Sequence, residues 1–263
     1  MAIVHRDRVA EGIGHPVTRR ILFTGDSITR GRLGVGYLRL LGKRFPGYEL
    51  VNLGRDGDTL LGIKARTLAH LAGSHSYDLL VIVAGHNDVI LPAFEQRSFV
   101  HRAVARQTAR RGSVPAPDYE SFLSTYRAFV EAIRSGAGIP VVVTTLSCIN
   151  EAPAGSTAER RRLYNHGIRD LAQEMAMGLA DVGAEFDQVL GVRECRDYFL
   201  PNPAATVLFD TWKSRTVAGA DALSAARRLH LTIDGVHLNS RGAHIYADAV
   251  GSFLIDVPPL VET

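Results

Sequence analysis

The sequence of 263 residues lacks the features that define several large classes of protein. It has only two cysteines, Cys148 and Cys195, and neither belongs to a Cys-x-x-Cys pair. We therefore exclude a disulfide framework and a cysteine-based zinc site, and we expect both thiols to be small buried side chains. No window reaches the ~18 apolar residues that a membrane-spanning helix requires. The first twenty residues also lack the apolar stretch of an export signal, so we expect a cytoplasmic protein unless such a signal has been removed.

The sequence also has little excess of positive over negative charge. The 30 Lys and Arg residues are nearly balanced by 27 Asp and Glu residues, which leaves a formal net charge of +3. Because this excess is spread along the chain, we expect neither nucleic acid nor a charged membrane surface as a partner. Hydrophobic residues make up 46% of the chain, which is typical of a globular protein rather than a disordered one.

Apolar runs and helix-like segments alternate along the chain. This alternation, with little hairpin signal, predicts βαβ units around a parallel sheet. The expected strands cover residues 21–24, 48–53, 78–84, 140–146 and 179–182. The expected helices cover residues 33–45, 60–71, 119–134, 157–177 and 240–254, the last capped by Asn239 or Ser240.

Two stretches, 92–117 and 191–228, interrupt this alternation. Each is longer than an ordinary connection, so we predict a partly helical insertion over one edge of the sheet. The sequence shows neither an internal repeat nor a linker rich in Pro, Gly or Ser. We therefore predict a single α/β domain over residues 1–263 that carries both insertions.

Polar segments follow three of the predicted strands, at the edge where open parallel sheets bind ligands. They can supply a serine hydroxyl, close-approaching backbone N–H groups and a side-chain amide that donates to a developing oxyanion. Each segment alone is also typical of an ordinary turn or helix cap. The segments are Gly25-Asp26-Ser27, the loop containing Gly54 and Gly57, and Gly85-His86-Asn87-Asp88.

A fourth polar segment, Asp234-Gly235-Val236-His237, precedes the last predicted helix. A carboxylate three residues before a histidine in one loop can fix the tautomer of the imidazole. The other ring nitrogen can then face a nucleophile. A serine hydroxyl needs such a base, because it is a weak nucleophile until its proton is removed.

Taken together and in this order, the four segments resemble the sequence blocks of the SGNH, or GDSL-type, hydrolases. Gly25-Asp26-Ser27 is similar to the nucleophile block, Gly57 to the glycine block, Gly85-x-Asn87-Asp88 to the third block and Asp234-x-x-His237 to the last. The resemblance extends from residue 21 to about residue 250. It implies a three-layer α/β/α sandwich, flavodoxin-like, with a central and mostly parallel five-stranded sheet. It also implies hydrolysis of a carboxylic ester of a small molecule, sugar or lipid through a serine acyl-enzyme.

The resemblance further implies a role for each matching residue. Ser27 would be the nucleophile, His237 the general base and then the general acid, and Asp234 the residue that orients His237. The N–H groups of Ser27 and Gly57 and the side-chain amide of Asn87 would form the oxyanion hole. We favour Gly57 over Gly54 because the Gly-Asp-Thr run that begins there fits the family block better. Neither a metal nor an organic cofactor is implied, and the implied partner is a small-molecule acyl ester.

Other residues near these segments carry weaker predictions. We expect His86 to face solvent, with contact to the substrate as the alternative, and Asp88 to be a structural hydrogen-bonding group in its loop. Arg102, Arg106 and Arg110 have helical spacing, which favours a solvated basic face; the alternative is recognition of an anionic substrate or a carrier-bound acyl group. The aromatic residues of the second insertion are expected to form a small core of their own, or alternatively to wall an acyl pocket; they are Tyr198, Phe199, Phe209 and Trp212.

Three other functions compete with ester hydrolysis. An acyltransferase would use the same acyl-enzyme, and the sequence does not separate the two, because they differ in water exclusion and acceptor binding. A metal-dependent phosphoesterase is disfavoured because Thr29 stands where that class needs a carboxylate. A non-catalytic binding module is disfavoured because Ser27, Asn87, Asp234 and His237 are all present. The acyl group, the leaving alcohol and the oligomeric state are left open.

Overall fold

One five-stranded sheet forms the centre of the computed structural model, which describes residues 19–73, 76–203 and 206–255. The strand order is β2-β1-β3-β4-β5, and each neighbouring pair is parallel. This is the flavodoxin-like order, so the predicted fold class is confirmed. The strands are β1 (Arg19–Gly25), β2 (Tyr48–Gly54), β3 (Leu79–Val83), β4 (Val141–Thr144) and β5 (Gly178–Ala180).

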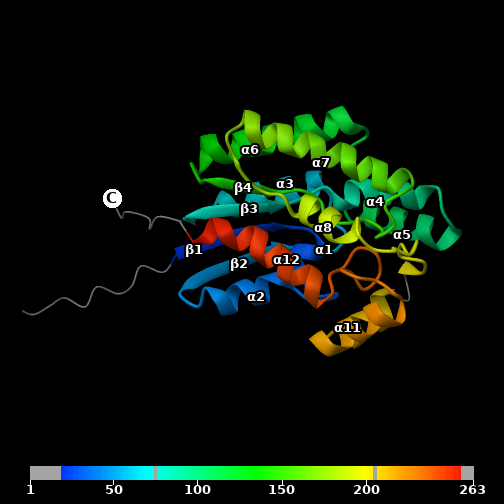
Figure 1. Cartoon of the computed structure of the whole chain (residues 1–263). Coiled ribbons are helices and arrows are strands. Elements are labelled where there is room, and N and C mark those ends of the chain that lie inside the picture. The colour runs from blue at the N-terminus through cyan, green and yellow to red at the C-terminus, as the bar shows by residue number, and fades with distance from the viewer. Residues whose placement is uncertain (1–18, 74–75, 204–205, 256–263) are drawn as a thin grey trace, which may run out of the picture.

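Helices cover both faces of this sheet (Figure 1). On one face α12 (Ser240–Gly251) packs against α2 (Tyr37–Arg44) and α8 (Val182–Leu190). On the other face α6 (Tyr119–Gly136) packs against α3 (Leu60–Leu71) and α7 (Ser156–Glu174). Every residue of β3 is buried, as expected for a central strand covered from both sides.

The helix boundaries follow local backbone chemistry. The helix predicted over residues 60–71 is confirmed as α3. The helix predicted from residue 33 begins only at Tyr37, because Gly34 has a φ of 77° and Gly36 occupies the N-cap position. Asn239 caps α12, since its side chain accepts a hydrogen bond from the N–H of Gly242. The chain continues beyond α12 as the short 3-10 helix η2 (Ser252–Leu254).

The three polar segments meet because the first three strands end at one level. Gly25, the last residue of β1, pairs with Gly54 of β2 and with Val83 of β3. The segments that follow are the short helix α1 (Ser27–Arg30), the loop to α3, and α4 (His86–Glu95). All of them therefore begin at the carboxyl edge of the sheet, which points towards α4 and α5 in Figure 1.

The long connections also lie beyond this edge (Figure 1). Residues 92–117 include the end of α4 and the helix α5 (Phe99–Arg110). Residues 191–228 include the π-helical turn η1 (Thr206–Asp210), α10 (Thr211–Lys213) and α11 (Val217–Ala226). None of the helices in the described ranges is long and apolar enough to cross a membrane.

The two cysteines are free thiols. Cys148 is buried as predicted, but the prediction is wrong for Cys195, which is only half-buried. Its Sγ lies 3.6 Å from the carbonyl oxygen of Leu190, just after α8 turns out of the core.

Candidate active site

Ser27 stands at a tight turn between β1 and α1. The carboxylate of Asp26 caps α1 by accepting the N–H of Ile28 at 2.9 Å, so Asp26 provides the predicted cap and Ser27 is left to face the site. Gly25 is required just before them, because a Cβ there would lie 2.2 Å from Oγ1 of Thr29 and 2.7 Å from the carbonyl oxygen of Val83. The turn therefore fits closely against β3.

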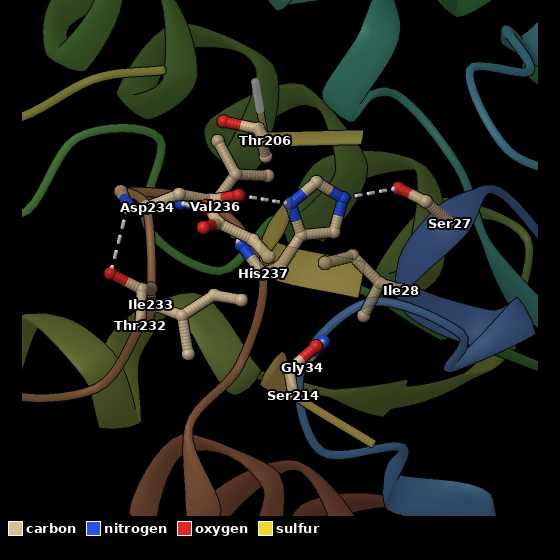
Figure 2. A network of polar contacts seen from close by, with 12 residues as sticks. Ser27, Ile28, Gly34, Thr206, Ser214, Thr232, Ile233, Asp234, Val236 and His237 are labelled. Atoms are coloured by element: carbon tan, nitrogen blue, oxygen red, sulfur yellow. Dashed lines mark hydrogen bonds and ion pairs between the residues drawn. The ribbon is translucent and has the colours of Figure 1, made fainter. Parts of the chain in front are cut away.

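The loop before α12 brings His237 to Ser27. Nε2 of His237 lies 3.0 Å from Oγ of Ser27, although the two residues are 210 positions apart in the sequence. Nδ1 of His237 lies 2.7 Å from Oδ2 of Asp234. Figure 2 shows the three side chains in a row joined by these two contacts.

Asp234 is held in place by its own loop. Its Oδ1 accepts the N–H groups of Val236 at 3.0 Å and His237 at 2.8 Å. With Oδ2 on Nδ1 of His237, the ring proton belongs on Nδ1, and the lone pair of Nε2 points at the Ser27 hydroxyl. This is the arrangement that a general base needs.

Burial and the neighbouring charge have opposite effects on the pKa values of Asp234 and His237. Burial alone would raise the pKa of the Asp234 carboxyl, but the neighbouring His237 ring and the hydrogen bonds hold that pKa below its usual range. Burial alone would lower the pKa of His237, but the carboxylate of Asp234 outweighs burial and raises that pKa above its ordinary value. The pair therefore favours an imidazolium at His237 once a proton arrives from Ser27.

Gly57 and Asn87 lie beside this row. Both line a cavity of about 770 Å³ that Ser27 and His237 also line, whereas Gly54 is not among its lining residues. Gly57 has a φ of 74°, a conformation that glycine adopts without strain. Nδ2 of Asn87 donates a hydrogen bond to the carbonyl oxygen of Asp58 at 2.8 Å, which fixes the amide beside the glycine loop.

The prediction that His86 faces solvent is wrong, and His86 is instead among the residues that line the cavity, as the alternative of contact with substrate requires. Its side chain is only 1% exposed because it points back under the nucleophile turn, where Nδ1 lies 3.2 Å from Oδ2 of Asp26. Neither atom makes a hydrogen bond of good geometry within the described part of the chain. Nε2 accepts the N–H of Ser147 at 3.2 Å. Since Asp26 precedes Ser27 and His86 precedes Asn87, this buried contact places the turn at Ser27 against the start of α4.

Arg66 of α3 connects the ends of the first two strands. Arg66 donates to the carbonyl oxygens of Gly25 at 2.9 Å and Leu53 at 3.0 Å, which are the ends of β1 and β2. It also pairs with the buried carboxylate of Asp58 at 2.5 Å.

Asp88 is confirmed as a structural hydrogen-bonding group. Its carboxylate accepts the N–H groups of Leu60 at 2.9 Å and Ala116 at 3.1 Å. Burial raises the pKa of Asp88 to about 6, although the hydrogen bonds from Leu60 and Ala116 oppose the shift.

Glu151 holds the loop that carries the His237 pair. This carboxylate is 1% exposed and accepts three successive N–H groups, from His230 at 2.7 Å and from Leu231 and Thr232 at 2.8 Å. It also accepts the hydroxyl of Thr232 at 2.7 Å. The sequence gives no signal for Glu151 and Arg66, because their partners are distant along the chain and no local pattern marks them.

The basic face of α5 does not belong to the cavity. Arg102, Arg106 and Arg110 are absent from its described lining, and Arg106 and Arg110 are exposed. The expected solvated basic face is therefore confirmed for Arg106 and Arg110, whereas Arg102 is half-buried and donates to the carbonyl oxygen of Arg97 at 2.7 Å. The lining of the cavity does not support recognition of an anionic substrate or a carrier-bound acyl group by this stripe. Arg111, just beyond α5, lines the cavity instead.

The aromatic residues of the second insertion do not wall the cavity either. None of Tyr198, Phe199, Phe209 and Trp212 is among the described residues that line it. Phe209 and Trp212 are exposed, so the four do not form one small core, and that expectation is also wrong. Phe199 is buried against Phe94 of α4, with ring centroids 5.9 Å apart.

The described residues contain no group of three or more His, Cys, Asp or Glu side chains placed to hold a metal ion. The polar groups around Ser27 are instead an imidazole, a carboxylate, an amide and backbone N–H groups. This set can remove a proton from the serine and can donate hydrogen bonds to a negatively charged oxygen.

Comparisons with known proteins agree with this geometry. The family model of the GDSL-like lipase/acylhydrolase family matches residues 23–245. No curated protein sequence matches the chain.

Solved structures with the same fold include several esterases. One is an acetyl xylan esterase, AlAXEase, with 20% identity, a TM-score of 0.59, and coverage of 89% of this chain and 99% of that one. Another is the acetylxylan esterase Axe2 from Geobacillus stearothermophilus, with 20% identity, a TM-score of 0.58, and coverage of 94% and 99%. A third is a member of the lipolytic protein G-D-S-L family from Veillonella parvula, with 15% identity, a TM-score of 0.58, and coverage of 91% and 100%.

Replacing Glu151 tests how firmly the loop is held. Glu151→Ala leaves three backbone N–H groups and one hydroxyl without their acceptor, so we expect the free energy of unfolding to fall by at least about 3 kcal/mol. Glu131→Ala on the exposed side of α6 is the control, with an expected change within about 0.5 kcal/mol. Urea unfolding measures both, and equal midpoints for the two variants would contradict the assignment.

Proposed function

Because the chain belongs to the GDSL-like lipase/acylhydrolase family and is a carboxylic ester hydrolase, we propose that it cleaves its substrate through an acyl-enzyme on Ser27. The observation that carries this proposal is the row of contacts from Asp234 through His237 to Ser27. A base at 3.0 Å from a serine hydroxyl is within proton-transfer reach. A buried carboxylate on the other ring nitrogen stabilises the charge that the base acquires.

The first half of the reaction acylates Ser27. Oγ attacks the acyl carbon while its proton passes to Nε2 of His237, and Asp234 stabilises the resulting imidazolium. The tetrahedral intermediate then collapses, the bond to the leaving oxygen breaks, and His237 returns the proton to that oxygen. The products are a free alcohol and an ester between the acyl group and Ser27.

The second half regenerates the enzyme. A water molecule gives a proton to His237 and attacks the same acyl carbon. The bond to Oγ then breaks, and the proton returns from His237 to Ser27. A carboxylic acid leaves, so every proton and bond balances and no cofactor is consumed.

Three donors are proposed for the oxyanion of both intermediates: the N–H groups of Ser27 and Gly57 and the side-chain amide of Asn87. An amide nitrogen carries two hydrogens, and Nδ2 of Asn87 uses one of them on the carbonyl oxygen of Asp58. The second hydrogen remains for the oxyanion. The hydrogen bond to Asp58 also orients the amide before substrate arrives, which lowers the reorganisation needed in the transition state.

The proposed substrate is a small-molecule acyl ester. Acetylated xylan is the substrate class named for two of the similar solved structures, but at 20% identity these show the fold alone. The acyl-enzyme can be attacked by water or by another acceptor, so the assay of the proposal includes both.

Hydrolysis of p-nitrophenyl acetate tests the proposed function. We expect turnover by the wild type, unchanged by EDTA, and loss of nearly all turnover in Ser27→Ala with its fold intact by circular dichroism. Added alcohols or amines should change the product ratio only slightly if water is the natural acceptor. Full activity in Ser27→Ala would overturn the acyl-enzyme, and dominant transfer to an acceptor would show an acyltransferase.

The pH dependence follows from the raised pKa of His237. Only the neutral ring can act as the base, so kcat/KM should fall about tenfold per unit as the pH drops below that pKa, which lies above the usual 6.5. Asp234→Asn removes the charge that raises the pKa. The acid limb should therefore move to lower pH while the plateau falls by roughly 10²–10⁴-fold.

The control for this profile is Asp170→Asn, an exposed carboxylate on α7. It should leave both the limb and the plateau unchanged. An unshifted acid limb in Asp234→Asn would show that a group other than His237 controls the profile.

Replacing Asn87 tests the oxyanion donor. Asn87→Ala should lower kcat by roughly 10²–10³-fold with little change in KM, because the lost interaction is made mainly in the transition state. Steady-state kinetics on p-nitrophenyl acetate provide the measurement, and urea unfolding shows how much stability is lost with the hydrogen bond to Asp58. A loss of kcat below about tenfold would remove Asn87 from the oxyanion hole.

A further inference from the structure

The cavity beside Ser27 is much larger and more apolar than an acetyl ester requires. Its volume of about 770 Å³ lies in the range of pockets that enclose whole drug-sized ligands. Its apolar wall comes from α4, from α5 and from Leu200, Pro203 and Leu208. The apolar lining residues include Ile90, Leu91, Phe94, Val100, Val104 and Leu208.

The apolar wall begins at the proposed oxyanion hole. Asn87 lies in the first turn of α4, and the next turns of that helix place Ile90, Leu91 and Phe94 on the cavity. The same wall therefore extends directly from the amide into the apolar part of the cavity.

Helix α5 packs against α4 and continues the apolar wall. Thr108, near the end of α5, faces Gly57, because a Cβ on that glycine would lie 3.3 Å from Cγ2 of Thr108. Val104 and Val100 follow at helical spacing towards the start of α5. At 1.5 Å per residue, the stripe from Thr108 to Val100 is about 12 Å long.

The charged lining residues are Arg32, Asp56 and Arg111. None of them comes from α4 or α5, so these two helices contribute no charged group to the cavity among the described residues. The polar side chains that these helices contribute are His86, Asn87, Gln107 and Thr108, and the rest of their lining is apolar. Against that apolar part a carboxylate or a sugar would lose its hydration without gaining a partner, whereas a hydrocarbon chain has no such cost.

We propose that the wall formed by α4 and α5 binds a linear, uncharged acyl chain of medium length, of which octanoyl is the test case. This inference rests on the proposed function and adds the substrate class. The acyl carbon must lie between Oγ of Ser27 and the donors at Gly57 and Asn87. The leaving alcohol must lie towards Nε2 of His237, which gives it a proton, and the chain on the acyl carbon then follows α4 and α5.

The expected selectivity follows from apolar burial. Each methylene moved from water into an apolar site favours binding by about fourfold. The p-nitrophenyl esters of acetate, butyrate, hexanoate and octanoate, each below its aggregation concentration, provide the series. We expect kcat/KM to rise along it and to be at least about tenfold higher for octanoate than for acetate.

A matched pair of variants on α5 tests where the chain lies. Ala103 and Ala109 are both exposed on α5, but Ala103 lines the cavity and Ala109 is absent from the described lining. Ala103→Trp should fill the path of the chain and lower the ratio of kcat/KM for octanoate over acetate by at least about tenfold. Ala109→Trp, with the same added side chain, should leave that ratio within about twofold of the wild type.

The outcomes separate the two proposals. A wild type that prefers acetate, or equal ratios in the two tryptophan variants, would overturn the acyl-chain site while Ser27-dependent hydrolysis stands. A second series, of acetate esters of alkyl alcohols of increasing length, varies the leaving group. If kcat/KM rises along that series but not along the acyl series, the wall holds the leaving alcohol and the acyl-chain site is overturned. Turnover that survives in Ser27→Ala would instead overturn the acyl-enzyme.

Discussion

The contact between Ser27 and His237 depends on the carboxyl edge of the parallel sheet. The two residues are 210 positions apart, and no short-range contact could bring Nε2 to 3.0 Å from Oγ. The register of β1 with β2 and β3 sets the level at which three loops begin. The fourth loop, which carries Asp234 and His237, leads into α12. That helix packs against α2 and α8 on one face of the same sheet. A shift of either part by a fraction of an ångström would weaken the proton transfer on which the proposed chemistry rests.

Buried polar groups hold these loops together. Arg66 links the ends of β1 and β2, His86 faces Asp26 beneath the nucleophile, and Glu151 collects the backbone N–H groups that precede Asp234. Such groups are costly to bury unless they are paired, so the contacts of Arg66 and Glu151 strongly disfavour a displaced loop. The contact of Asp26 with His86 is the least well satisfied, since neither atom has a well-directed hydrogen bond in the described residues. Imperfect local satisfaction next to reacting groups is common in active sites, where function limits stability.

The sequence was sufficient to predict the fold because its signals are local. The apolar run that forms β3 and the periodic segment that forms α3 lie where the pattern predicted them. The parallel sheet followed from the βαβ alternation, and its flavodoxin-like class followed from the family resemblance. The site residues could be named for a related reason, since each stands at the end of a strand or next to a helix cap.

What the sequence could not predict depends on long-range packing. His86 was expected in solvent, yet the first turn of α4 directs it inward against Asp26. The aromatic residues near 198–212 were expected to pack together or to wall a pocket, but Phe209 and Trp212 are exposed and Leu208 reaches the cavity. Helical spacing correctly grouped the arginines of α5, but only the packing of that helix shows that its opposite side faces Ser27. Periodicity gives the faces of a helix, and tertiary structure decides which one is used.

The central claim is that His237 activates Ser27. A fluorophosphonate probe reacts covalently with an activated serine, so intact-mass and peptide mass spectrometry of the treated protein test the claim directly. We predict one adduct, located on Ser27, absent in Ser27→Ala and formed far more slowly in His237→Ala. An unlabelled Ser27 in the folded wild type would contradict the account and would favour a binding module without catalysis. Equal labelling rates in the wild type and His237→Ala would show that the contact in the structure does not activate the serine.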